Sequence, residues 1–376
     1  MSQFPDSVVG LAQALVRIPS VNPDGDPGTD GIREQACAEF VAGFLRSIGA
    51  EVALREVHPG RPNVVGRFAA GSGKPKLLLA PHTDTVSVAG MTIDPFGGEV
   101  QDGRLYGRGA SDTKGSMAAM LWALHECRDI LPSLPHEIWF AGLMGEEAGQ
   151  DGAKALAAEE TFDFVVVGEP TDFEVVYKHK VDMTARITAT GRSAHSSCPQ
   201  RGENAIIKLA AGLLSMQEKL AACFSTIDDP VLGHPTFSVG TIRGGAKFNI
   251  VPDHAEAVVD LRLLPSQWKD REAADVLDAM RAACPGLEVT RISGSQALDT
   301  DPEHPLVAKL VAAGGRPAGA AWFCDAAIFS ARGIPAVAIG PGSIAQAHTA
   351  DEFIEVSALA AGADYFKKFL HSLRAG

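Results

Sequence analysis

Four short apolar runs in this chain each end at a glycine or proline, and each is soon followed by a histidine or an acidic residue. Runs of this length between turn residues are typical of buried strands. In an open α/β sheet, the binding site lies beyond the carboxyl ends of the strands. We therefore expect an α/β fold in which four strand ends converge on one crevice. The runs cover residues 77–80, 137–144, 164–167 and 336–339, and the polar residues behind them are His82, Glu146, Glu147, Glu169 and His348.

The first run continues into the sequence PHTD, which contains His82 and Asp84. Because these residues are two apart in an extended chain, their side chains point to the same side. The spacing suits a metal-bound imidazole and the carboxylate that orients it, since a ligating histidine usually donates its second ring N–H to an acceptor. The alternative is a surface loop that carries two polar residues.

A further acidic residue, Asp112, stands just before an apolar helix expected over 117–127. It could cap that helix, or it could join the candidate ligands. The pooled nitrogen and oxygen donors favour zinc, cobalt or manganese over copper or iron–sulfur sites. A bridging carboxylate would allow two ions to share a hydroxide and polarise a carbonyl. Adjacent Glu146 and Glu147 cannot easily point the same way, so one can bind metal while the other transfers protons.

Composition excludes several functional classes. The formal charge of −13 and the lack of a long basic run argue against nucleic-acid binding. The first 20 residues do not have the pattern of a secretory signal, and no run of 18 apolar residues occurs. Six cysteines without a C-x-x-C pair argue against disulfides and cysteine-bound zinc. We expect a cytoplasmic protein with no membrane partner and no nucleic-acid partner.

A chain of 376 residues suits two domains. The pattern changes in the middle, where a long strand over 175–190 is followed by a helix, two strands, a second helix over 270–283 and a last strand. This β-α-β-β-α-β order is the ferredoxin-like arrangement. We therefore expect an inserted domain over 177–293, between the two parts of a larger domain over 1–176 and 294–376.

Seven motifs of the chain resemble those of a known family of dinuclear zinc amidohydrolases, which includes acetylornithine deacetylase, succinyl-diaminopimelate desuccinylase, aminoacylase and carboxypeptidase G. The resemblance extends from RIPSVNP near the start to AHTADEF near the end. It implies a zinc-peptidase-like catalytic domain with a mixed central sheet and helices on both faces, and it makes the insert a dimerisation and lid domain. The motifs are APHTDTV, GRGASDTKG, MGEEAGQDGA, GEPTD, GRSAHSS, NIVPDHAEAVVDLR and GPGSIAQAH.

The resemblance also implies roles for individual residues. One zinc ion would be held by His82, Asp112 and Glu169. The other would be held by Asp112, Glu147 and His348, with Asp112 bridging and with cobalt or manganese as substitutes. Asp84 would orient His82, and Glu146 would be the general base and later the acid.

Three residues of the insert receive roles from the same resemblance. His195 would stabilise the oxyanion from a partner subunit of a homodimer. Arg262 and Asn249 would receive the carboxylate of the substrate, a task that suits the guanidinium group. The alternatives are a loop histidine at position 195 and an ordinary surface ion pair at Arg262.

The expected function is hydrolysis of the amide bond of an N-acyl amino acid by a metal-bridged water, with Glu146 as general base. The segment GPGSIAQAHTADEF resembles the acetylornithine deacetylase branch, which implies arginine biosynthesis, although no motif identifies an acidic partner for the ornithine ammonium group. A dipeptidase, an aminopeptidase or a carboxypeptidase G-like peptidase on the same site is the alternative. A non-enzymatic relative should lack a ligand or the base, and here all six residues are present.

Overall fold

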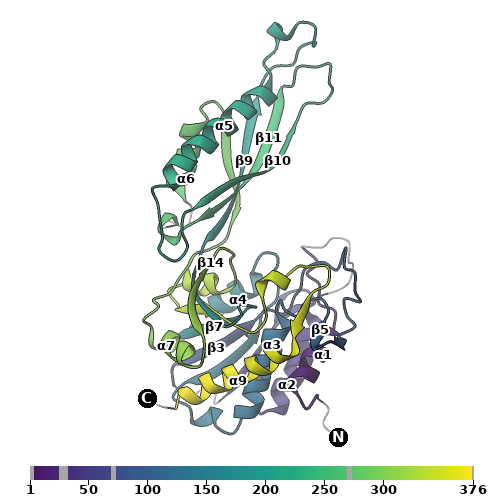
Figure 1. The fold of residues 1–376 in the computed structure, drawn as a ribbon, viewed down its shortest axis with the longest axis vertical. Coiled ribbons are helices and arrows are strands. Elements are labelled where there is room, and N and C mark those ends of the chain that lie inside the picture. Colours follow the sequence, from purple (N-terminus) through teal and green to yellow (C-terminus); the bar gives the residue numbers. More distant parts are fainter. Residues whose placement is uncertain (1–3, 25–32, 69–72, 269–272, 375–376) are drawn as a thin grey trace. The chain divides into compact units, whose positions relative to one another are not determined.

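The computed structural model describes residues 4–24, 33–68, 73–268 and 273–374. The chain forms two compact units (Figure 1). The first unit contains Met1–Tyr177, Thr300–Ala318 and Cys324–Gly376, and the second contains Lys178–Asp299 and Gly319–Phe323. The short segment Gly319–Phe323 lies outside the boundaries expected for the insert.

A mixed sheet forms the centre of the first unit, as the family resemblance implied. Its strands follow the order β1-β2-β6-β3-β7-β15-β8-β13, and β14 also pairs with β8; β13 and the last residues of β14 are counted with the second unit. The inner strands β6, β3, β7 and β15 are parallel, whereas β1, β2 and β8 pair antiparallel with their neighbours. The strands are β1 Glu51–His58, β2 Arg61–Phe68, β3 Lys76–Pro81, β6 Glu137–Gly142, β7 Phe164–Gly168, β8 Glu174–His179, β13 Leu298–Asp299, β14 Arg316–Ala320 and β15 Ala336–Ala338.

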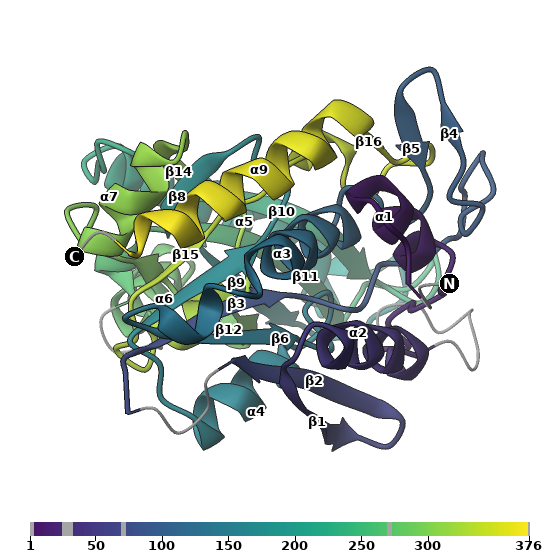
Figure 2. The same cartoon turned by 90° about the horizontal axis from the view of Figure 1, so that it is seen from below.

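Helices cover both faces of this sheet. Figure 2 shows α2 and α3 on one side and α4 on the other. Helix α3 packs between α1 and α9, and α4 contacts α8. Because the inner strands are covered on both faces, their side chains are apolar on both faces, and β6 and β7 are buried along their whole length. The helices are α1 Val8–Val16, α2 Gln35–Ser47, α3 Lys114–Cys127, α4 Asp151–Glu159, α7 Pro305–Ala312, α8 Ala326–Ser330 and α9 Val356–Ser372.

A small three-stranded sheet joins two distant parts of the first unit. Strand β5 (Arg104–Tyr106) pairs with β4 (Val100–Gln101) on one side and with β16 (Phe353–Glu355) on the other. In the second pair, Tyr106 lies opposite Phe353. The chain therefore leaves β5 towards Asp112 beside the segment that connects His348 to β16.

The second unit has the predicted β-α-β-β-α-β order, with an antiparallel sheet in the order β10-β11-β9-β12. Burial alternates along β9 and β11, because α5 and α6 cover only one face of the sheet. Its elements are β9 Val181–Thr190, α5 Ala205–Phe224, β10 Thr236–Gly244, β11 His254–Leu263, α6 Ala274–Ala283 and β12 Glu288–Gly294.

Two details of the predicted insert differ from the structure. The long strand expected over 175–190 is two strands, β8 and β9, separated at Lys180. The backbone N–H of Lys180 donates instead to the carbonyl oxygen of Ala320, at 3.1 Å. The start of the helix expected over 270–283 falls on residues 269–272, outside the described part of the chain, and α6 begins at Ala274. None of the helices in the described residues combines the length and the apolar character needed to cross a bilayer.

Candidate metal centre

The parallel strands bring the predicted polar residues to one edge of the sheet. Pro81 at the end of β3 lies opposite Gly168 at the end of β7, so His82 and Glu169 leave neighbouring strands at the same level. His82 also forms a bridge with Leu143, just after β6. Beyond Leu143 the chain turns at Gly145, whose φ of 76° favours glycine, and reaches the two adjacent glutamates.

Five of these residues form two overlapping clusters that share Asp112. One cluster is His82, Asp112 and Glu169, the other is Asp112, Glu147 and His348, and within each the ligand atoms lie within 4.8 Å of one another. Oδ1 of Asp112 lies 3.1 Å from Nε2 of His82, and Oδ2 lies 3.4 Å from Nε2 of His348. Asp112 thus presents one oxygen to each histidine.

The two clusters differ in burial. His82, Asp112 and Glu169 are buried, whereas the side chain of His348 is 54% exposed. Hydrogen bonds with Asp112 and Glu147 raise the pKa of His348 to about 10. Burial, and then the charge of Asp112, raises the pKa of Glu147 to about 7. Burial opposes ionisation of Asp112, yet hydrogen bonds from His348 and His82 lower its pKa.

The residues of both clusters fit divalent cations. Oε1 of Glu147 and Oε1 of Glu169 are buried and have no hydrogen-bond partner among the described residues. A buried carboxylate oxygen normally has a donor or a cation beside it. All the candidate donor atoms are imidazole nitrogens and carboxylate oxygens, the ligands of zinc, cobalt and manganese. One cation in each cluster would complete the coordination of these oxygens.

Asp84 fixes the surroundings of both clusters. Nδ1 of His82 lies 2.9 Å from the backbone oxygen of Asp84 and must donate to it, which leaves the lone pair of Nε2 for a metal. The carboxylate of Asp84 is farther from Nδ1, at 3.5 Å. It accepts hydrogen bonds from Asn22 and from the backbone N–H groups of Glu146 and Glu147, at 2.8, 3.1 and 3.0 Å. In the structure the Asp84 backbone oxygen orients His82, and the Asp84 carboxylate holds the glutamate loop.

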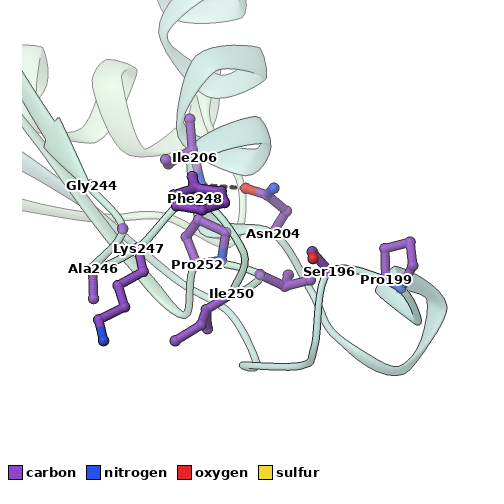
Figure 3. A pocket seen from close by; sticks show the side chains of 12 residues that line it. Ser196, Pro199, Asn204, Ile206, Gly244, Ala246, Lys247, Phe248, Ile250 and Pro252 are labelled. Atoms are coloured by element: carbon purple, nitrogen blue, oxygen red, sulfur yellow. Dashed lines mark hydrogen bonds between the residues drawn. The ribbon is translucent and has the colours of Figure 1, made fainter.

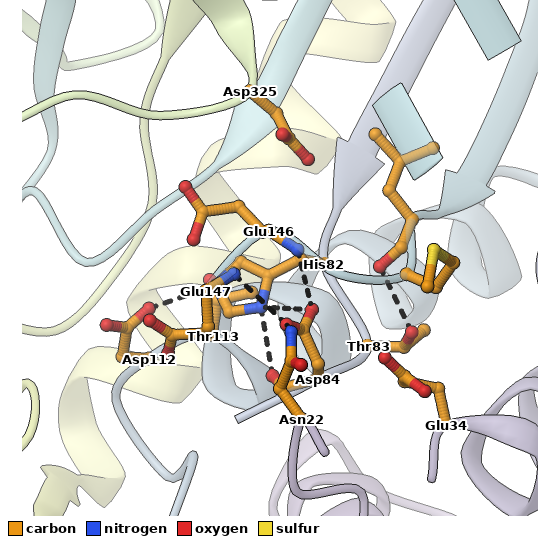
Figure 4. Close-up of polar contacts among 12 residues, drawn as sticks. Asn22, Glu34, His82, Thr83, Asp84, Asp112, Thr113, Glu146, Glu147 and Asp325 are labelled. Carbon is orange, nitrogen blue, oxygen red and sulfur yellow. Dashed lines mark hydrogen bonds and ion pairs between the residues drawn. The ribbon is translucent and has the colours of Figure 1, made fainter. Parts of the chain in front are cut away.

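Glu146 is half-buried and belongs to neither cluster. Figure 4 shows Glu146 together with His82, Glu147 and Asp325, whose charges act on its carboxylate. Burial and the nearby carboxylates of Glu169, Asp325 and Glu147 raise its pKa well above the usual value. A carboxylate with this proton affinity, beside a metal centre, can accept a proton from water.

The sequence did not single out Asp325, which is buried next to this centre. Its Oδ1 accepts a hydrogen bond from Nε2 of Gln150 at 3.2 Å, while its Oδ2 has no partner among the described residues. Burial raises the pKa of Asp325 to about 7. A single aspartate in the sequence FCDAA gives no pattern by which it could have been found.

Residues near the start of α3 also support the centre. The helix has Thr113 as its N-cap residue, so the alternative role of Asp112 as the cap is wrong. The hydroxyl group of Thr113 donates to the carbonyl oxygen of Gly168, and that of Ser116 donates to the carbonyl oxygen of Glu169. These two hydroxyl groups anchor the end of β7, from which the Glu169 side chain projects.

The remaining predicted site residues belong to the second unit. His195 is exposed, and its Nδ1 accepts a hydrogen bond from the backbone N–H of Ser197 at 3.2 Å. A neutral His195 therefore carries its proton on Nε2. The loop is held against the segment that contains Asn249, because the N–H of Ser196 donates to the carbonyl oxygen of Asn249 at 3.1 Å.

Arg262 forms the ion pairs that the sequence left open as its alternative role. Nε and Nη2 donate to the carboxylate of Asp260 at 3.1 and 3.2 Å, and Nη2 lies 3.7 Å from Oδ1 of Asp182. The three residues come from the same face of the second sheet, because Arg262 lies directly opposite Asp182 in the β9–β11 pair. A role of Arg262 in substrate binding stays a prediction.

Comparison with known proteins gives a consistent assignment. The model of peptidase family M20/M25/M40 matches residues 78–372. Acetylornithine deacetylase from Proteus mirabilis is 32% identical over 365 residues, which cover 93% of this chain and 92% of that protein. Acetylornithine deacetylase from Photorhabdus laumondii is also 32% identical, with the same coverage.

Solved structures share the fold over nearly the whole chain. Aminopeptidase PepT from Bacillus cereus has a TM-score of 0.77 at 22% identity and covers 97% of this chain and 98% of its own. An M20 family metallo-carboxypeptidase from Sulfolobus solfataricus has a TM-score of 0.77 at 20% identity and covers 98% of this chain and 100% of its own. This chain belongs to peptidase family M20/M25/M40 and is an enzyme of the metallopeptidase and amidohydrolase class.

Proposed function

We propose that this enzyme hydrolyses the amide bond of an N-acyl amino acid at a dinuclear metal centre, as an acetylornithine deacetylase-like enzyme. One observation carries the proposal. Two ligand clusters share Asp112, and beside them stands a glutamate, Glu146, that belongs to neither cluster and has a raised pKa. The curated acetylornithine deacetylases that match over 93% of the chain support the choice of substrate class.

The proposed cofactors are two zinc ions, with cobalt or manganese as substitutes. The buried unpartnered oxygens of Glu147 and Glu169 support this proposal. A Bacillus subtilis protein with the same fold, at a TM-score of 0.69 and 13% identity, is described as a dinuclear metal-binding peptidase of the M20 family. Bound divalent ions would supply Lewis acidity, which lowers the pKa of water and polarises the scissile carbonyl group.

Glu146 moves the proton in this proposal. Its backbone N–H is tied to Oδ1 of Asp84 at 3.1 Å, so the carboxylate is presented from a fixed loop. Its raised pKa allows it to take the proton of the attacking water and later to return it to the leaving amine. The neighbouring Glu147 is left to bind metal.

His195 would stabilise the oxyanion across a homodimer. Because Nδ1 accepts from Ser197, a neutral His195 carries its proton on Nε2, which can then donate to an oxyanion. The His195 loop and the segment 244–252 line a pocket of about 540 Å³ in the second unit, where Phe248 is fully exposed (Figure 3).

The second unit also offers a surface for association. Ile207 and Leu214, one heptad apart on α5, are 65% and 70% exposed. Strand β10 is at the edge of its sheet, and its residues Val239 and Ile242 are exposed. An apolar helix face beside an unpaired strand edge is typical of a surface that pairs with another copy. We therefore assign the second unit to dimerisation.

Arg262 and Asn249 would bind the carboxylate of the substrate, with the second unit acting as a lid. Asp260 and Asp182 would hold the guanidinium group of Arg262 in a fixed orientation until the substrate binds. Deacetylation of acetylornithine would place the enzyme in arginine biosynthesis in the cytoplasm.

A peptidase acting at the same site is the second candidate. The aminopeptidase and the metallo-carboxypeptidase with this fold support it. Such an enzyme recognises a free amino group or a peptide carboxylate next to the scissile bond. Assays of an N-acetyl amino acid and of the corresponding unblocked dipeptide separate the two candidates.

The test of the proposed function is Glu146→Gln. The variant should bind metal as the wild type does and lose roughly 10²–10⁴-fold in kcat, because an amide cannot accept the proton of water. Glu159→Gln is the matched control, because Glu159 is exposed at the end of α4, and it should keep full activity. Metal analysis should find up to two divalent ions, and a chelator should abolish hydrolysis. Hydrolysis that survives chelation would contradict the proposal.

A further inference from the structure

A buried carboxylate outside both ligand clusters connects them through the backbone. Glu352 is completely buried just before β16, four residues after His348. Its Oε1 accepts hydrogen bonds from the backbone N–H groups of Ser111 and Asp112 at 2.9 and 3.0 Å. Its Oε2 accepts from the backbone N–H of Gly109 at 3.0 Å and from Nη1 of Arg108 at 2.7 Å. One carboxylate thus holds the whole loop that ends at Asp112.

Arg108 extends this contact to the other ligand segment. It is buried, and its Nη1 also donates to the carbonyl oxygen of Thr349 at 3.2 Å, next to His348. Its Nε donates to the carbonyl oxygen of Ser87 at 3.0 Å, three residues after Asp84. The guanidinium group therefore ties three segments together: the loop before Asp112, the segment after His348 and the segment after Asp84.

We infer that Glu352 is a positioning residue for the metal centre, which sets the backbone of the shared ligand Asp112 and, through Arg108, the segment that carries His348. The inference rests on the proposed dinuclear site and adds a residue to which neither the motifs nor the clusters assigned a role. Asp112 is the ligand on which both clusters depend. A displacement of its backbone therefore affects both cations, and a displacement at Thr349 affects the cluster with His348.

The chemistry of the four contacts requires a carboxylate. All four groups around Glu352 are hydrogen-bond donors, and only a carboxylate accepts at both oxygens. In Glu352→Gln, the amide NH₂ would face two donors, and the buried guanidinium of Arg108 would lose its counter-charge. The variant keeps the shape of the side chain while it releases part of the loop.

The test is calorimetric titration of the metal-free full-length protein with Zn²⁺. The wild type should bind two equivalents, and Glu352→Gln should bind both with roughly 10–100-fold lower affinity, the usual effect of losing a residue that orients a ligand. Glu355→Gln is the matched control, because Glu355 is three residues away, is half-exposed and forms an ion pair with Arg104 at the surface. It should bind as the wild type does.

Arg108→Lys provides a milder second variant in case Glu352→Gln does not fold. A lysine keeps the charge beside Glu352 but cannot also reach the carbonyl oxygens of Ser87 and Thr349. One equivalent, assigned to the cluster with His348, should then weaken more than the other. Val307→Ala, on α7 in the hydrophobic core of the first unit, separates general destabilisation from an effect on the centre, since it should lower the melting temperature and leave both affinities unchanged.

The outcomes separate this inference from the proposed function. A folded Glu352→Gln variant, or an Arg108→Lys variant, with two wild-type affinities overturns the inference and leaves the dinuclear site intact. A wild-type protein that binds no Zn²⁺ overturns both. If Val307→Ala weakens Zn²⁺ binding as much as Glu352→Gln does, the weaker binding is a consequence of lower protein stability, and the inference is also overturned.

Discussion

The predicted functional residues of the two units are held in different ways. In the first unit, both nitrogens of the buried His82 are engaged, one by the backbone of Asp84 and one by Asp112. In the second unit, the imidazole of the exposed His195 is held through Nδ1 by Ser197 of its own loop. The candidate metal centre therefore lies within one unit, whereas His195, whose Nε2 has no hydrogen bond to any described residue, is suited to a site completed by another surface.

The two units also differ in the feature that lowers their folding stability. The first unit buries several carboxylates together, and Asp325 has an oxygen without a partner among the described residues. The second unit instead exposes apolar side chains on α5 and β10. Burial of unpaired charge and exposure of apolar surface both lower stability. Each is expected where a cation, a substrate or a second subunit completes the structure.

Subunit mixing is the strongest test of this difference. Glu146→Gln should be nearly inactive, and His195→Ala should lose roughly 10²–10³-fold in kcat, as expected for an oxyanion donor. If each site combines Glu146 of one subunit with His195 of the partner, a mixed dimer has one whole site of two. With random exchange about half of the dimers are mixed, so activity should recover to roughly a quarter of the wild-type value.

Mass measurement of the dimers provides the control for this experiment. The exchange must be demonstrated before activity is interpreted. Mixed dimers without recovered activity would show that His195 serves its own subunit or takes no part in the chemistry. The first unit would then no longer differ from the second in this respect, because His195 would not need a partner subunit.

The sequence predicted the strand ends of the metal centre because their signal is local. The run before His82 and the run before Glu169 are apolar, short and followed by turn residues, which is enough to place them in parallel strands. Alternation alone misjudged the strand over 175–190, since the pattern continues through Lys180 while the hydrogen bonding changes there. Alternation of polar and apolar side chains does not indicate with which strand a backbone N–H group forms its hydrogen bond.

The supporting residues were not predictable in the same way. Glu352 directly follows another acidic residue, Asp351, and Asp325 stands alone; in most proteins acidic residues of either kind are on the surface. Only the packing of distant segments buries them, over a separation of 240 residues between Asp112 and Glu352. A pattern that extends over one strand or helix contains no information about such a contact.

Substrate charge provides the second test of the comparison. Arg262→Ala should reduce kcat/KM by roughly 10–100-fold for substrates with a free carboxylate and much less for their amides, because the guanidinium group binds the carboxylate. Asp260→Asn should give a smaller loss, since Asp260 only holds Arg262 in place. Equal losses for acids and amides would assign Arg262 to the ion pairs with Asp260 and Asp182 alone, and the second unit would lose its proposed role in substrate binding.

The smallest expected effect concerns the stability cost of Asp325 in the first unit. Burial raises the pKa of Asp325 from 3.8 to about 7, so the folded state holds this proton more tightly than the unfolded chain. The free energy of unfolding of the metal-free protein should therefore fall as the pH rises from about 4 to about 7. Asp325→Asn removes this ionisation and should stabilise the protein by about 1–3 kcal/mol at pH 8.

Urea unfolding of the metal-free wild type and variant over this pH range measures the effect. The difference should be largest above about pH 7 and should vanish below about pH 4, where the wild-type carboxyl group is protonated in both states. Asp364→Asn, at an exposed position of α9, is the control and should show no such trend. A less stable Asp325→Asn protein at pH 8 would mean that the charge of Asp325 is compensated in the folded state. The buried carboxylates of the first unit would then not lower its stability in the absence of cations. The two units would differ only in how deeply their functional residues are buried.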